Sequence, residues 1–263
     1  MSVTAVPDPA PLLSTRGLTR TFGGVAAVSN VDIDVRPGRL HAVIGPNGAG
    51  KTTLFNLLTG VLSPSRGEIL FDGEPVTRVS VSGRVKRGLA RSYQNTNIFP
   101  RMTVRQNIRA AAYRAHSVGW RSFFGRPESV DAADAKAEQI LRDLDVEQHA
   151  DMVAQNLPYG AQRLVDIGLA LACEPKLLLL DEPTSGLSSG ELDQASAFIG
   201  SLKASHSILL IEHNMDLVLR LADVITVLNF GEVLAEGDAA EISANQAVQE
   251  AYFGKGFGRA ARQ

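Results

Sequence analysis

A glycine-rich segment that runs into a lysine and two threonines is the part of this chain best suited to chemistry. Residues 45–53 read GPNGAGKTT and match the pattern G-x-x-x-x-G-K-[ST] without a mismatch. This pattern is typical of a loop that binds nucleotide phosphates through backbone N–H groups at a helix N-terminus. Lys51 would reach the β- and γ-phosphates, the hydroxyl of Thr52 would hold Mg²⁺, and Thr53 would contact a phosphate oxygen or cap the helix. The predicted nucleotide contacts are Gly45, Pro46, Asn47, Gly48, Ala49, Gly50, Lys51, Thr52 and Thr53.

The segments on either side of this loop favour the phosphate-binding interpretation. Residues 39–44 (RLHAVI) have the pattern of a short buried strand, and residues 54–58 (LFNLL) that of the start of a helix. The motif requires this strand–loop–helix context. A glycine-rich turn with an incidental lysine is the alternative, and the flanking pattern argues against it. The sequence therefore predicts a nucleoside triphosphate site.

Two adjacent carboxylates follow a run of four leucines later in the chain. Residues 177–180 are all leucine, and Asp181 and Glu182 come directly after them. A carboxylate at the end of a buried strand beside a phosphate-binding loop can contact Mg²⁺, usually through water, which is the role we predict for Asp181. Glu182 could orient an attacking water or accept its proton. A strand that simply ends in an acidic turn is the alternative, which the upstream loop disfavours.

His213 follows another apolar run, residues 208–211 (ILLI). It is therefore expected at the same carboxyl edge of the sheet, where open α/β sheets bind their ligands. A lone histidine at a strand end is more often structural than catalytic. Because it is expected beside the loop and the two carboxylates, we predict that His213 contacts the γ-phosphate.

Composition and charge limit the classes of protein to which the chain can belong. Its 263 residues, 44% of them apolar and 21% charged, are those of an ordinary globular protein with a substantial core. The net charge of −2 argues against a nucleic-acid binder, which usually has a strongly basic domain. One cysteine, Cys173, excludes an internal disulfide framework, and its apolar neighbours suggest that it is buried. No apolar run approaches the roughly 18 residues of a membrane span, and no signal peptide is evident, so a cytoplasmic location is expected.

The order of strand-like and helix-like segments indicates an α/β fold. Strand patterns occur at residues 12–19, 31–35, 40–44 and 67–73, the last of which ends in an Asp-Gly turn. Residues 104–144 favour helices, with an interruption at 119–127, and strand patterns return at 177–180, 207–211 and 224–228. Such alternation implies a parallel sheet covered on both faces, with the helical block as an insertion. Residues 1–11 are expected to be disordered and residues 255–263 loose.

One further loop resembles a family signature. Residues 157–163 read LPYGAQR and resemble the signature loop, commonly L-S-G-G-Q, of ATP-binding cassette (ABC) proteins. The resemblance implies that Pro158, Tyr159 and Gly160 bind the γ-phosphate of an ATP held by another subunit, so that two cassettes enclose two ATP molecules. Gly160 would sit just before a helix, where free N–H groups and the helix dipole favour an anion.

The family resemblance also implies a fold and further site residues. The fold would be a P-loop NTPase of the RecA-like type, with a parallel sheet core, an antiparallel β subdomain and an α-helical subdomain inserted at about residues 95–165. Residues 12–254 would form a single ATPase domain. Gln94 would contact Mg²⁺ and the attacking water and sense a membrane partner. Phe22 would stack on adenine, and residues 186–188 would form the D-loop of the dimer interface.

The chain departs from the common pattern of the family at four positions. Pro158 replaces the signature serine and Tyr159 the first signature glycine. Ala161 separates Gly160 from the glutamine that usually follows it, and Ser188 stands where aspartate is common. These departures bear on the catalytic rate and on the dimer interface rather than on ATP binding.

A narrower resemblance concerns the type of transporter. Residues 88–104, 211–216, 227–231 and 251–254, with the insertion near Trp120, look like the ATPases of branched-chain amino-acid importers, whose relatives move urea, short amides or aromatic acids. This likeness implies an ATP-hydrolysing subunit, peripheral on the inner face of the cell membrane. Its partners would be transmembrane permeases, a second cassette (identical or related) and, indirectly, an extracytoplasmic solute-binding protein. The cargo itself stays open.

Two other classes share much of this pattern. The ATPase of a lipid or lipopolysaccharide exporter would have every motif and differ only in its partner. A soluble cassette ATPase acting on nucleic acid or ribosomes usually has a long coiled-coil insertion or two cassettes in one chain, and this sequence has neither. A P-loop nucleotide kinase would lack the loop at 157–162 and His213.

Overall fold

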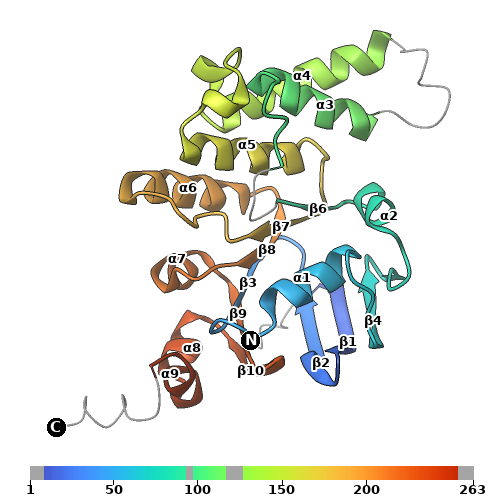
Figure 1. The fold of residues 1–263 in the computed structure, drawn as a ribbon, viewed down its shortest axis with the longest axis vertical. Coiled ribbons are helices and arrows are strands. Elements are labelled where there is room, and N and C mark those ends of the chain that lie inside the picture. Colours follow the sequence, from blue (N-terminus) through green and yellow to red (C-terminus); the bar gives the residue numbers. More distant parts are fainter. Residues whose placement is uncertain (1–8, 93–96, 117–126, 254–263) are drawn as a thin grey trace, which may run out of the picture.

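A mostly parallel six-stranded sheet forms the centre of the computed structural model, which describes residues 9–92, 97–116 and 127–253 (Figure 1). The strand order is β10-β9-β3-β8-β7-β6, and only β10 runs antiparallel to its neighbour. Every residue of β3, β7 and β8 is buried, as expected for strands covered on both faces. The strands are β3 (Leu40–Ile44), β6 (Leu89–Arg91), β7 (Leu177–Asp181), β8 (Ser207–Ile211), β9 (Val224–Asn229) and β10 (Glu232–Gly237).

A second, antiparallel sheet packs on one side of the central sheet. Its order is β2-β1-β4-β5, with β1 (Leu13–Phe22), β2 (Val25–Val35), β4 (Arg66–Phe71) and β5 (Glu74–Pro75). Asp72 and Gly73 connect β4 to β5 with φ of 54° and 77°, the backbone of a type I′ turn, which confirms the predicted tight turn. Helix α1 (Lys51–Thr59) lies between the two sheets, and its apolar side chains share one core with both. This core fixes the direction of the helix that begins at the phosphate loop.

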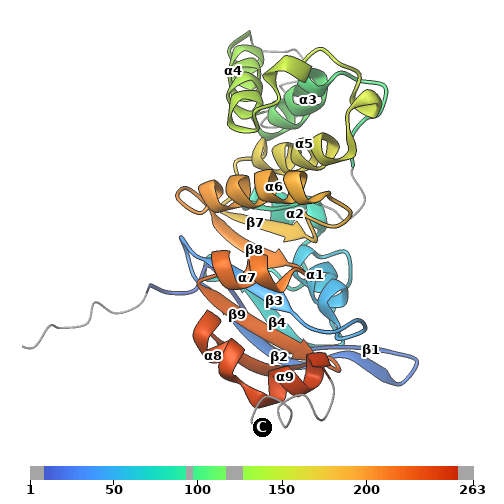
Figure 2. The same cartoon turned by 90° about the vertical axis from the view of Figure 1, so that its left-hand side faces the viewer.

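Helices cover the opposite face of the central sheet (Figures 1 and 2). Leu177 and Leu179 of β7 belong to the core around α1, whereas Leu178 and Leu180 belong to the helical core, because successive strand residues point to opposite faces. The covering helices are α6 (Ser189–Leu202), α7 (Met215–Leu221), α8 (Ala239–Ala244) and α9 (Gln246–Phe253).

Three further helices form the inserted helical part at one end of the molecule (Figure 1, top). They are α3 (Val104–His116), α4 (Pro127–Asp143) and α5 (Tyr159–Leu171), with two 3₁₀ turns, η2 (Glu147–His149) and η3 (Ala154–Asn156), between α4 and α5. Arg109 of α3 forms an ion pair with Asp134 of α4. Gly168 allows α5 to approach α4 closely, because a Cβ there would lie 3.1 Å from a methyl group of Ile140 in α4 and 2.7 Å from one of Leu144, directly after α4.

The fold class predicted from sequence is confirmed, and the differences are local. The strands predicted at 40–44 and 207–211 have those bounds, whereas β2 begins at Val25 rather than at residue 31. Strands β6 and β10 and helix α2 (Val81–Lys86) were not anticipated: β6 has three residues, and β10 is too polar to show a strand pattern. The interruption predicted at 119–127 lies almost entirely outside the described residues. Within the described part of the chain, no helix has the length and apolarity needed to cross a membrane.

Arg84 of α2 caps the carboxyl end of α1 with hydrogen bonds. Its guanidinium donates to the carbonyl oxygens of Leu57 (2.7 Å) and Leu58 (2.6 Å), and to those of Thr77 and Val79, both at 3.1 Å. The side chain is fully buried, and burial lowers its pKa to about 10. A cation at this end of the helix also complements the helix dipole.

Replacing Arg84 by methionine is expected to lower the free energy of unfolding by about 3 kcal/mol, because buried carbonyl groups lose their donors. Chemical denaturation of the purified chain measures this change. Arg87→Met at the C-cap of the same helix is the matched control, since Arg87 is exposed and its side chain donates to Gly83 O on the surface. Equal stability of the two variants would show that Arg84 does not fix α1.

Candidate nucleotide-binding and hydrolysis site

The loop between β3 and α1 has a backbone that requires glycine. Gly45 and Gly50 have φ of 155° and 102°, and Gly50 is the N-cap of α1. A Cβ on Gly45 would lie 2.2 Å from Leu228 O, and one on Gly50 would lie 2.3 Å from Ala27 O. A side chain at either position would therefore displace the loop, which explains the glycines of the sequence pattern.

Lys51 is the first residue of α1, and its side chain lies along the loop. Its Nζ donates to Gly45 O at 2.6 Å and to Pro46 O at 3.1 Å, and only 6% of the residue is exposed. Burial lowers the pKa of this ammonium group, and the charges of Glu182 and Asp181 oppose that shift. The cation is thus held where negatively charged phosphates would meet the loop.

The structure brings residues 47–53 of the predicted loop, Glu182 and His213 together in one cavity of about 330 Å³, named the phosphate cavity after its predicted ligand; Gly45 and Pro46 do not line it. They come from the carboxyl ends of β3, β7 and β8, which are neighbours in the sheet. Glu182 Oε1 lies 2.5 Å from His213 Nε2. The lining residues are Ala27, Asn47, Gly48, Ala49, Gly50, Lys51, Thr52, Thr53, Glu182 and His213, of which only Ala27 was missed from the sequence.

Glu182 has an unusual backbone conformation. Its φ is 49°, in the left-handed region that side chains other than glycine seldom adopt. Its N–H donates to Ile211 O at 2.9 Å, so the β7–β8 pairing continues up to the residue at which the chain turns. Such strain persists where the surroundings enforce it, and it is common at functional sites. The turn directs a carboxylate that is 10% exposed toward His213, whose side chain is 45% exposed.

Asp181 is not among the residues that line this cavity. It is 3% exposed, and its Oδ2 is 2.5 Å from Nη2 of Arg91, the last residue of β6. Arg91 also donates to Asn56 Oδ1 of α1 at 2.7 Å. Sequence analysis missed Arg91, because nothing along the chain indicates that β6 pairs with β7.

The predicted magnesium donors fit the ion chemically. Thr52 lines the cavity, and the charge of Asp181 acts on Lys51 of the same loop, so both offer near the loop the oxygen ligands that Mg²⁺ prefers. Mg²⁺ retains several waters, which suits a carboxylate that does not line the cavity. Gln94, the third predicted donor, lies outside the described residues.

Phe22 is not brought into this cavity. It ends β1, is 44% exposed, and is absent from the residues that line the phosphate cavity. The guanidinium carbon of Arg20 lies 4.7 Å from the centre of its ring. A flat ligand group could therefore stack on this ring only if it extended beyond the phosphate cavity.

The signature loop lies at the start of α5, away from the phosphate loop. Pro158 is the N-cap and Gly160 is in the first turn, rather than ahead of the helix as predicted. The N–H of Gly160 donates to Glu191 Oε1 at 3.3 Å, and Tyr159 is 48% exposed. Hydrogen bonds from Ser188 lower the pKa of the Glu191 carboxyl. Among the described residues, none of 158–160 lines the phosphate cavity of its own chain.

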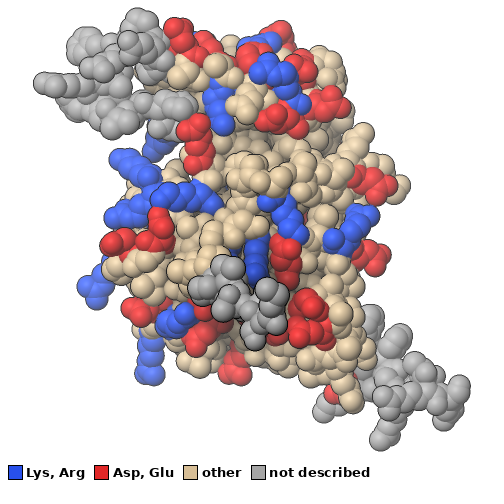
Figure 3. All heavy atoms as spheres, turned by 180° about the vertical axis from the view of Figure 1, so that it is seen from behind, with Lys and Arg blue, Asp and Glu red and all other residues tan. Residues whose placement is uncertain are grey.

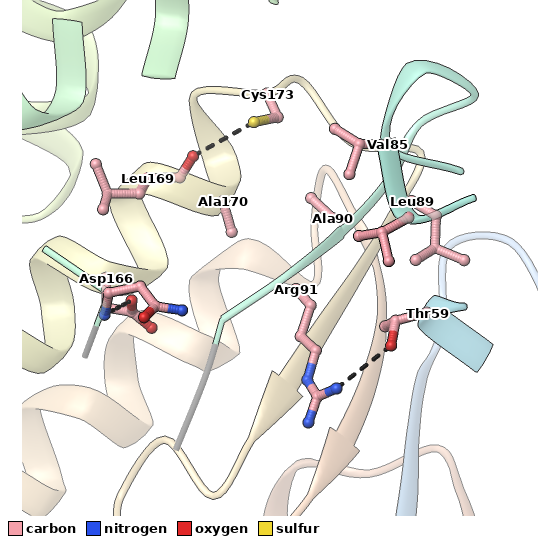
Figure 4. A pocket seen from close by; sticks show the side chains of 11 residues that line it. Thr59, Val85, Leu89, Ala90, Arg91, Asp166, Leu169, Ala170 and Cys173 are labelled. Carbon is pink, nitrogen blue, oxygen red and sulfur yellow. Dashed lines mark hydrogen bonds between the residues drawn. The ribbon is translucent and has the colours of Figure 1, made fainter. Parts of the chain in front are cut away.

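A second cavity of about 230 Å³ lies between α2, β6 and α5 (Figure 4). Its wall is mostly apolar, and the side chain of Arg91 extends from it toward Thr59 (Figure 4). Cys173, which was expected to be buried, is instead half-buried on this wall, and burial raises the pKa of its thiol. The apolar lining consists of Val81, Val85, Leu89, Ala90, Leu169 and Ala170.

Two protein-family descriptions match parts of this chain. Residues 28–185 match the family described as ABC transporter, and residues 232–258 match one described as branched-chain amino acid ATP-binding cassette transporter.

Individual relatives extend the similarity over nearly the whole chain. The high-affinity branched-chain amino acid transport ATP-binding protein BraF of Pseudomonas aeruginosa is 36% identical over 93% of this chain and 98% of its own length. The protein of the same description, LivG, from Escherichia coli K12 is 38% identical with the same coverage. A crystal structure of an ATP-binding cassette of an ABC transporter in its ADP conformation is 30% identical with a TM-score of 0.81. The match covers 94% of this chain and 100% of the chain in that crystal structure.

Proposed function

This chain belongs to the ABC transporter family of ATP-hydrolysing cassettes, and from that premise we propose that it powers an importer of branched-chain amino acids or of related small polar solutes such as urea or amides. The relatives of that description match nearly the whole of both chains, and the match at residues 232–258 lies outside residues 28–185, which match the general ABC transporter family. The motifs at 88–104 and 211–216 support the same assignment.

The convergence of Lys51, Glu182 and His213 in one cavity is the observation that carries the proposed mechanism. The loop N–H groups and Lys51 bind the phosphates of ATP. Glu182 orients the attacking water and accepts its proton, and His213 donates to the γ-phosphate. Mg²⁺, held by Thr52, Asp181 and Gln94, would neutralise charge that develops on the phosphates. Catalysis then consists of positioning and charge stabilisation.

A second cassette, a copy of this chain or a related one, completes the site. Residues 158–160 do not line the phosphate cavity of their own chain, and Tyr159 is exposed. In a head-to-tail pair these residues would meet the γ-phosphate held by the other subunit. Phe22 would stack on adenine at the outer end of the site. ATP binding would close the pair, and hydrolysis would reopen it.

The apolar cavity between α2 and α5 is the proposed docking site for a cytoplasmic segment of a permease. Exposed basic residues Arg78, Lys86 and Arg87 lie on or beside α2, whose Val81 and Val85 line the cavity. Figure 3 shows lysine and arginine side chains gathered on one flank of the back view. A basic flank beside a docking cavity suits the anionic inner face of a membrane. The chain would thus be peripheral on that face, and a solute-binding protein would contact the permeases rather than this chain.

Uptake of labelled solutes tests the proposed transport function. Cells that lack this chain are expected to lose uptake of leucine, urea or a short amide, and the wild-type chain should restore it. Glu182→Gln should be expressed but fail to restore uptake, because binding would continue without hydrolysis. Unchanged uptake of all three solutes in the deficient cells would exclude the proposed cargo class.

Restoring the signature serine should accelerate hydrolysis. Pro158→Ser adds a hydroxyl that can donate to the γ-phosphate in the closed pair, and a hydrogen bond to a charged group contributes about 1.5 kcal/mol or more, which corresponds to about tenfold or more in rate. Serine is also a better N-cap for α5, where Pro158 makes no side-chain cap. Steady-state ATPase assays, with Pro158→Ala as the control without a hydroxyl, measure the change. An unchanged or lower rate for Pro158→Ser would mean that the backbone already supplies the contact.

A further inference from the structure

The loops that present Glu182 and His213 are joined by a buried carboxylate to which the sequence analysis assigned no role. Glu212 lies between the last residue of β8 and His213, and it is only 2% exposed. Its Oε1 accepts hydrogen bonds from the N–H and the hydroxyl of Thr184, at 2.9 and 2.6 Å. Its Oε2 accepts one from the N–H of His213 at 3.0 Å. One side chain therefore binds the backbone of both loops.

These contacts close a ring around the proposed reacting groups. Thr184 follows Glu182 by two residues, and the side chain of Glu182 meets that of His213 at 2.5 Å. The backbone from 182 to 184, the hydrogen bonds of Glu212 and the contact between Glu182 and His213 thus link these residues in one continuous ring. The strained backbone of Glu182 and the half-exposed ring of His213 both need such support. Glu212 lies where it can supply this support to both residues.

We propose that Glu212 is a positioning residue that holds Glu182 and His213 in their mutual geometry for ATP hydrolysis. This inference rests on the roles proposed above for those two residues. Three donors face the carboxylate, and only an acceptor with two oxygens satisfies all of them. Glutamine has one acceptor oxygen and one NH₂ donor group, so it leaves at least one of these donors opposed by another donor. An unsatisfied buried group would displace one loop relative to the other.

Glu212→Gln should therefore separate catalysis from binding. We expect kcat to fall between about tenfold and about a hundredfold, because small displacements of catalytic groups have effects of this size. The Kd for ATP should change by less than about threefold, since Glu212 is not among the residues that line the phosphate cavity. The variant should also accumulate an ATP-bound dimer on a sizing column, as expected for a chain that binds without hydrolysing. A merely structural defect would weaken that dimer.

Thr184 supplies a second, milder test that does not depend on Glu212→Gln folding. Thr184→Val removes the hydroxyl donor and should lower kcat between about threefold and about tenfold, whereas Thr184→Ser should recover most of that loss. Ser196→Ala is the matched control, because Ser196 is also buried and donates to Leu192 O of its own helix, α6, at 2.6 Å. It should leave kcat unchanged.

The outcomes distinguish this inference from the proposed function. The role of Glu212 would be overturned if Thr184→Val and a folded Glu212→Gln both kept the wild-type kcat. It would also be overturned if Ser196→Ala lowered kcat as much as Thr184→Val does. Loss of the ATP-bound dimer in Glu212→Gln would also contradict it. Full activity of Glu182→Gln, measured alongside, would instead contradict the proposed site.

Discussion

Replacing Lys51 by alanine is expected to abolish ATP binding at micromolar concentrations and, with it, hydrolysis. The ammonium group is the cation that lines the cavity beside the phosphate loop, where it is held by Gly45 O and Pro46 O. A charge-assisted contact to phosphate contributes about 3 kcal/mol, so affinity should fall by about a hundredfold or more. The desolvation that lowers the pKa of Lys51 would be offset when phosphates arrive.

Equilibrium binding of a fluorescent ATP analogue measures the effect of Lys51→Ala. Lys86→Ala is the control, because Lys86 is exposed on α2 and does not line the cavity. Its Kd should match that of the wild type. Micromolar affinity retained in a folded Lys51→Ala would place the nucleotide elsewhere.

Glu182→Gln is expected to lower kcat between about a hundredfold and about ten-thousandfold while leaving ATP bound, because the amide cannot accept a proton from water. The substitution keeps the size of the side chain and can keep the contact to His213, so the cavity should stay intact. With hydrolysis slowed, the ATP-enclosed dimer should accumulate.

A sizing column run with and without ATP, together with phosphate release, tests the expectation for Glu182→Gln. Glu147→Gln, on an exposed 3₁₀ turn of the helical part, should behave as the wild type. Full hydrolysis by Glu182→Gln would exclude this carboxylate as the group that activates water. A slow variant that stays monomeric with ATP would contradict the shared-site arrangement.

The parts of the site that depend on local sequence were predictable. The loop at 45–53 is specified by the spacing of its glycines: Gly45 and Gly50 leave no room for a Cβ beside Leu228 O and Ala27 O, and Gly48 has a φ of 81°. Glu182 and His213 could be placed together because the carboxyl ends of neighbouring parallel strands meet at one edge of the sheet. The tight turn at Asp72 and Gly73 followed equally from local chemistry.

The rest depends on which segments pair in three dimensions. Arg91 reaches Asp181 only because the three-residue strand β6 pairs with β7, and so short a strand gives no sequence signal. Gly160 was expected ahead of its helix but lies in the first turn, bonded to Glu191 from a different helix. The signal for Glu212 was present: a carboxylate directly after a buried strand, as at Asp181. Its role could not be interpreted without knowing that Thr184 lies within hydrogen-bond distance of the Glu212 carboxylate.

Identification of the proteins that hold this chain at the membrane tests the central claim most directly. The chain would be purified from its native membranes in mild detergent, with a photo-crosslinking residue at Val85 in the apolar cavity and, as a control, at exposed Asp193 of α6. We predict that multi-span permeases, a second cassette and a solute-binding protein co-purify, and that only the Val85 position crosslinks to a permease. Recovery of ribosomal or DNA-associated proteins alone would contradict the importer assignment, even with the ATPase site intact.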